Sequence, residues 1–134
     1  SNVLSLNQNL SKWNVSSVTD MGMLFSYAES FNKHLSEWDV SRVTDMTGMF
    51  MRAAMFDCDI SKWNVASVTK MDEMFFHAAS FSQKLCGDTW VNSKANKKSM
   101  FIDSQGTISC RRRGRYQPKS KEDLKGAVNK CRDR

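Results

Sequence analysis

The chain repeats one block of sequence three times at a period of 25 residues. The hexapeptide Leu10-Ser11-Lys12-Trp13-Asn14-Val15 recurs at 35–40 and at 60–65, and each copy is followed by a Val-Thr-Asp/Lys-Met block and a spaced Phe, Ala and Phe. A period of about 20 to 50 residues indicates stacked units, because one such unit is too small to bury its apolar face alone. We therefore predict a solenoid whose function resides in a repeated surface.

Two patterns inside each unit predict its local structure. The spacing of Val43, Met46, Phe50 and Ala53 places them on one face of a short helix. The alternating stretch 37–40 predicts a very short strand with its Trp and Val pointing inward. The predicted fold class is an α/β repeat solenoid, with leucine-rich-repeat-like coils of one short parallel strand plus one short helix.

The repeated apolar positions define the expected core. Trp13, Trp38 and Trp63 form one predicted inward column. Methionine fills irregular gaps in cores, so we assign the methionines to packing rather than to a metal site. One core position is shared by Met21, Met46 and Met71.

The repeat divides the chain into three predicted parts. Residues 1–83 form the solenoid, with a partial coil at 1–9 whose cut edge implies a preceding chain segment or a subunit at the N-terminal end. Residues 84–110 form a degenerate capping coil, in which Trp90 arrives two residues late. Residues 111–134 form a basic linker and an amphipathic tail helix.

The positive net charge of +6 comes from the end of the chain. Residues 1–110 hold 10 Lys and Arg against 11 Asp and Glu, whereas residues 111–134 hold 10 against 3. A solvated linker is the first interpretation of Arg111, Arg112, Arg113 and Arg115, and an anionic partner is the alternative. We do not expect nucleic acid to be the main partner.

Four cysteines allow three pairings if all are bridged. Cys86 and Cys110 bracket the aberrant coil, where a disulfide would staple the cap; four free thiols are the alternative, and the pairing of Cys58 and Cys131 stays open. Asn9 and Asn14 each begin an Asn-x-Ser glycosylation tripeptide. Together these features favour an extracellular or cell-surface location, with an organelle lumen as the alternative.

No catalytic, cofactor or metal motif occurs in the sequence, so we expect a protein that is not an enzyme and has no cofactor. His34 and His77 fall at different repeat positions and are interpreted as exposed spectators. No apolar run is long enough to predict a membrane span.

Outward polar positions recur at the same 25-residue period as the core positions. The polar ladder that they form alternates in charge and would suit a protein or polysaccharide partner, although solvated positions with no ligand explain the same pattern. The ladder consists of Lys12, Asn14, Glu37, Asp39, Lys62 and Asn64.

The repeat pattern L-S-x-W-[ND]-V-S-x-V-T-D-M-x-x-M-F-x-x-A-x-x-F-N resembles the BspA-type leucine-rich-repeat family of surface proteins. The resemblance covers residues 3–81, and Trp90 to Ser109 is similar to the closing segment of algal members. It implies a non-enzymatic structural or interaction module, one solenoid block of a secreted or surface-displayed protein used for attachment or protein binding. The alternative is a subunit of a larger complex or filament, assembled through the solenoid edges and the tail helix.

Overall fold

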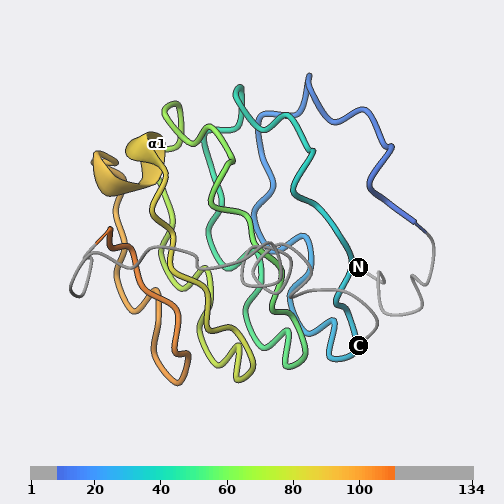
Figure 1. The fold of residues 1–134 in the computed structure, drawn as a ribbon, viewed down its shortest axis with the longest axis vertical. Helices are drawn as coiled ribbons and strands as arrows, with labels where there is room; N and C mark the ends of the chain where they lie inside the picture. Colours follow the sequence, from blue (N-terminus) through green and yellow to red (C-terminus); the bar gives the residue numbers. More distant parts are fainter. Residues whose placement is uncertain (1–8, 111–134) are drawn as a thin grey trace, which may run out of the picture.

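The computed structural model describes residues 9–110, which wind into consecutive coils stacked along one axis, from blue to orange in Figure 1. We number the coils by their residues: coil 1 is 10–34, coil 2 is 35–59, coil 3 is 60–84 and coil 4 is 85–110. Parallel bridges join equivalent positions in successive coils, from Asp20 to Asp45, from Asp45 to Lys70 and from Lys70 to Asn96. A further parallel bridge pairs Lys84 with Thr107.

The predicted α/β class is wrong. The described coils contain one helix, α1 (Asp88–Val91), and isolated bridges, but no sheet and no repeated helix. Segment 43–53, whose spacing predicts a helix, is instead a series of tight turns. The N–H groups of Met49 and Ala53 donate to the carbonyls three residues earlier, at 3.2 and 3.0 Å.

Left-handed backbone at two positions of every coil prevents the helix. Right-handed helices need negative φ, whereas these residues have φ between 55° and 64°. The first column contains Met23, Gly48, Glu73 and Ser99, and the second contains Tyr27, Arg52, His77 and Asp103. A turn at each position reverses the chain before a second helical turn can form.

Along these turns, every second backbone N–H group donates a hydrogen bond to the next coil of the stack. In coil 1, the N–H groups of Met21, Met23, Phe25 and Tyr27 donate to carbonyls of coil 2 at 2.8 to 2.9 Å. Coils 2 and 3 repeat this pattern toward coils 3 and 4. Backbone hydrogen bonds between coils therefore replace those that a helix would make within itself.

The predicted strand is also absent, although its inward residues are correct. Trp38 and Val40 are buried, yet the Trp38 N–H closes a turn onto the Leu35 carbonyl at 3.0 Å. On this side of the stack, indole N–H groups link coils 2 and 3 each to the coil before it. That of Trp38 donates to the Leu10 carbonyl at 2.9 Å, and that of Trp63 to the Leu35 carbonyl at 2.8 Å.

Stacked phenylalanine rings fill the centre of the coils. Phe25, Phe50, Phe75 and Phe101 follow one another with ring centroids 5.5 to 5.6 Å apart. A second column consists of Phe31, Phe56 and Phe81, with ring centroids 5.8 to 6.0 Å apart. It ends at Gly106, where a Cβ would overlap the Phe81 ring. The predicted methionine column, Met21, Met46 and Met71, is buried as expected.

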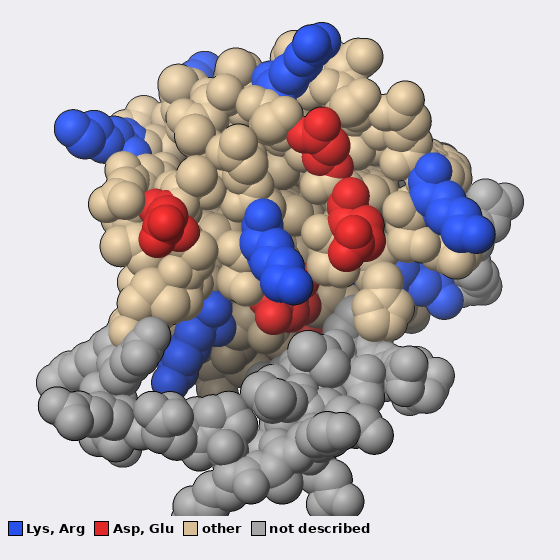
Figure 2. Space-filling view, turned by 45° about the horizontal axis from the view of Figure 1, so that its top comes forward, with Lys and Arg blue, Asp and Glu red and all other residues tan. Residues whose placement is uncertain are grey.

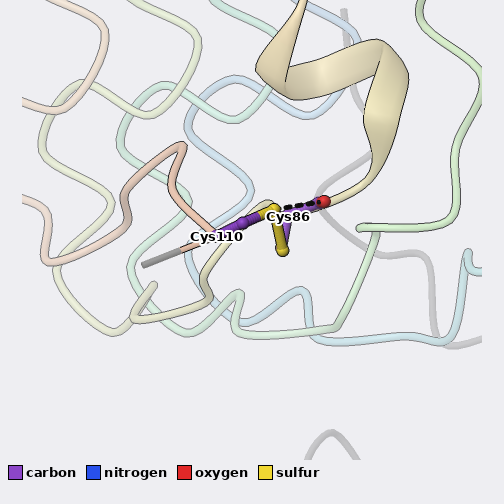
Figure 3. Close-up of a disulfide and its surroundings, with 2 residues drawn as sticks. All are labelled: Cys86 and Cys110. Atoms are coloured by element: carbon purple, nitrogen blue, oxygen red, sulfur yellow. Dashed lines mark hydrogen bonds between the residues drawn. A yellow bond between two sulfur atoms is a disulfide. The ribbon is translucent and has the colours of Figure 1, made fainter. Parts of the chain in front are cut away.

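In coil 4, Trp90 comes two residues late and lies in α1. This single helical turn returns Trp90 to register, and its indole N–H donates to the Ile60 carbonyl at 3.0 Å. Gly87 lies so close to the Ser61 carbonyl that a Cβ would overlap it. Just before α1, Cys86 forms a disulfide with Cys110, as predicted (Figure 3). The disulfide ties the start of coil 4 to its end.

Candidate functional site

The six residues of the polar ladder all lie exposed on the turns that carry the repeated tryptophan. We call these turns, residues 11–16, 36–41 and 61–66, the polar turn face. The view in Figure 2, turned to bring the top of Figure 1 forward, shows basic and acidic side chains interspersed, with neither sign forming a large patch. Lys12, Glu37 and Lys62 make no ion pair within 4.0 Å among the described residues, so the expected attraction between neighbours is at most weak.

Asx turns hold half of the ladder in fixed positions. Asn14, Asp39 and Asn64 each accept the backbone N–H two residues later through Oδ1, at 3.0 to 3.1 Å. The hydroxyls of Ser16 and Ser41 also donate to Asn14 and Asp39, at 2.6 Å. These side chains shape the turn first, which leaves the amide Nδ2 groups of the two asparagines directed at solvent.

Hydrogen bonds lower the pKa of two aspartates, Asp39 in the ladder and Asp45 outside it. Donation from the Ser41 hydroxyl, then from the Ser41 N–H, holds the pKa of Asp39 below its ordinary value, and Arg42 adds to the effect. The Thr47 N–H is the main cause that lowers the pKa of Asp45. Both carboxylates are therefore ionised at neutral pH.

Trp13 departs from the predicted inward column. Its side chain is 52% exposed, whereas Trp38 and Trp63 are buried. Each buried indole is covered by the coil before it, and no described coil precedes Trp13. It borders an apolar cavity of about 460 Å³ at the N-terminal end of the stack. The cavity is lined by Leu10, Trp13, Val15, Val18, Met21 and Trp38, among others.

A second exposed edge was not foreseen from the sequence. The guanidinium of Arg52 lies 5.7 Å from the Tyr27 ring centroid and 5.9 Å from that of Phe76. Beside them His77 Nδ1 lies 2.6 Å from Asp103 Oδ2. The residue type on this edge changes from coil to coil, so the repeat does not reveal it. The left-handed turns that form the edge favour glycine, but only Gly48 among their residues is a glycine.

The other predicted residues lie off the polar turn face or outside the described residues. Asn9 is exposed close to it, and glycosylation of Asn9 and Asn14 stays a prediction. Cys58 is buried in coil 2. The basic residues Arg111, Arg112, Arg113 and Arg115, the tail helix and Cys131 lie outside the described residues.

Residues 9–110 contain neither a candidate metal site nor a candidate membrane span. No group of three or more His, Cys, Asp or Glu side chains there could hold a metal ion. No helix in that range has the length and apolar character to cross a membrane.

Comparison with known proteins places the repeat in a family. No curated protein and no solved structure matches the chain. One family does match, over residues 1–109, and its description is "Mycoplasma protein of unknown function, DUF285". The match includes all three regular repeats and coil 4. The chain therefore belongs to the DUF285 family.

Proposed function

We propose that this chain is a non-enzymatic structural and interaction module, one repeat block of a secreted or surface-displayed protein of the BspA type, used for attachment or protein binding. The observation that carries the proposal is the polar turn face, where exposed polar side chains recur in every regular coil and Asx turns fix half of them. Side chains that are already ordered lose less conformational entropy on binding than free ones.

The partner that fits this face is a protein or a polysaccharide. Charges of both signs, amide groups and hydroxyls recur along it, so it offers hydrogen bonds to an extended polar chain without strong attraction for polyanions. The disulfide between Cys86 and Cys110 supports an oxidising location, the cell surface or exterior, with an organelle lumen as the alternative.

Charge reversal on the polar turn face tests this function. The full chain is offered to arrays of neutral and acidic polysaccharides and of cell-surface proteins. We expect the variant Lys12→Glu/Glu37→Lys/Lys62→Glu to lose at least tenfold in affinity for whichever probe binds. The control is Lys84→Glu, which changes the net charge by the same amount at an exposed position off this face.

Deletion of residues 111–134 separates the rival site. If the ladder variant binds like the wild type and the truncated chain does not, the basic tail carries the interaction and the proposal for the polar turn face fails. Binding that survives truncation and is lost in the ladder variant supports it.

A further inference from the structure

The N-terminal face of the stack presents a row of backbone carbonyls that accept no hydrogen bond from residues 9–110. In coil 2 the carbonyls of Asp45, Thr47, Met49 and Met51 accept N–H groups from coil 1. Their equivalents in coil 1 accept no hydrogen bond within residues 9–110. These open acceptors are the carbonyls of Asp20, Gly22, Leu24 and Ser26.

The C-terminal face presents the matching donors. In coil 3 the N–H groups of Met71, Glu73, Phe75 and His77 donate to coil 4 at 2.7 to 2.9 Å. Their equivalents in coil 4 donate to nothing in the described part of the chain. These open donors are the N–H groups of Lys97, Ser99, Phe101 and Asp103.

The two faces also share a backbone shape. Ser99 and Asp103 have φ of 56°, close to the 60° and 64° of Met23 and Tyr27, so coil 4 repeats the turns that stack on one another inside the molecule. Apolar groups accompany the polar ones. Trp13 and the cavity of about 460 Å³ lie at the N-terminal face, and Ile102 is 46% exposed on coil 4.

We propose that the N-terminal face of one copy binds the C-terminal face of a second copy, so that the stack of coils continues from molecule to molecule. The four open N–H groups of coil 4 would donate to the four open carbonyls of the partner's coil 1, as coil 3 donates to coil 4. The occupant is a second copy because this chain itself supplies the donors in the required spacing.

Pairing of two N-terminal faces is disfavoured by the same groups. Both edges would present acceptors, and acceptors do not bond to one another. A head-to-tail contact uses different patches on the two partners, and such contacts produce open chains rather than closed dimers. The polar turn face stays exposed in this arrangement, so its proposed function stands or falls separately.

Two variants, each blocked at one face, test the proposal on the full chain. Trp13→Glu places a charge at the N-terminal face. Ser99→Glu does so at the C-terminal face, and its column accepts Glu at the same φ in Glu73. Met55→Glu is the control, because Met55 is 42% exposed in coil 2, at neither end. Circular dichroism and thermal unfolding establish that each variant folds like the wild type.

Sedimentation velocity from micromolar to millimolar concentration gives the readout. We expect the wild type and Met55→Glu to form species that grow with concentration, and each face variant to remain a 15.3 kDa monomer. A mixture of the two face variants should form a dimer and stop there, because it contains one intact pair of faces. A monomeric wild type, or self-association of Ser99→Glu alone, would overturn the proposal.

Discussion

Buried tryptophans in this protein connect neighbouring coils as well as fill the core. On the side of the polar turn face, the indole N–H groups of coils 2 to 4 donate to the Leu or Ile carbonyl of the coil before. The same carbonyls also close the local turns of coils 1 to 3. Each of these indoles therefore packs its ring in the core and also holds the turn of the preceding coil in place.

Removing one indole N–H should weaken the stack. We expect Trp63→Phe to lower the free energy of unfolding by about 1–3 kcal/mol, through the lost hydrogen bond to the Leu35 carbonyl and the smaller ring. Trp13→Phe is the matched control and should stay within about 0.5 kcal/mol of the wild type, because Trp13 is half exposed. Urea unfolding measures the free energy of unfolding of both variants. Equal losses would contradict a stabilising role for the indole hydrogen bonds between coils.

Asp39 makes stability sensitive to acid. Its pKa is lowered in the folded chain, so its contribution is present above the ordinary value of 3.8 and is lost as the pH falls below that value through the folded pKa. Asn occupies the same repeat position in coils 1 and 3 and keeps the Oδ1 acceptor. We expect Asp39→Asn to lose less stability than the wild type between about pH 5 and pH 2. If the urea midpoints of the wild type and of Asp39→Asn fall by the same amount across that range, this role of Asp39 is contradicted.

The apolar spacing of each unit predicts the core correctly and the element incorrectly. Met46, Phe50 and Ala53 are all buried, as a helix would place them. A chain of tight turns gives the same inward spacing, since it also reverses about every four residues. The left-handed backbone distinguishes the tight turns from a helix. Three of the four residues in its first column are not glycine, so the sequence does not indicate these turns. Sequence patterns therefore identify which residues are buried but not the turns that bury them.

Among the glycines of residues 9–110, Gly48 combines a left-handed backbone with a steric overlap. Its φ is 60°, and a Cβ there would overlap Met23 Sδ of coil 1. We expect Gly48→Ala to cost roughly 1–2 kcal/mol for the left-handed backbone and a smaller steric part, because the Met23 side chain is 47% exposed and can move. Met23→Ala/Gly48→Ala should recover the steric part, which a double-mutant cycle measures. Strict additivity of the two substitutions would show that the contact is absent.

The ends of the stack differ although the coils between them are alike. At the C-terminal end Gly106 closes one ring column and the Cys86–Cys110 disulfide ties coil 4 together. The cysteine positions around the irregular coil were enough to predict this disulfide. The sequence predicts a cut edge at the N-terminal end, but not the exposure of Trp13, because exposure depends on which coils are adjacent.

Removing the disulfide should loosen coil 4. In the chain-entropy model, Cys86→Ser/Cys110→Ser lowers the free energy of unfolding by roughly 3 kcal/mol for a loop of this size. Thermal unfolding without reductant measures the loss. Cys58 is also disulfide-bonded, so in reductant the wild type and the double variant both lose that bond and should unfold alike. Unchanged midpoints in both would contradict a structural role, as would peptide mapping that finds both thiols alkylated before reduction.

Amide hydrogen exchange by NMR, on solutions dilute enough to hold single copies, tests the stack most directly. The coils are joined by alternate backbone N–H groups, and within residues 9–110 the equivalent groups of coil 4 have no acceptor. We predict slow exchange at Glu73, Phe75 and His77 and fast exchange at Ser99, Phe101 and Asp103. Equal protection of the two sets, or continuous protection from 97 to 103 as in a helix, would contradict the account.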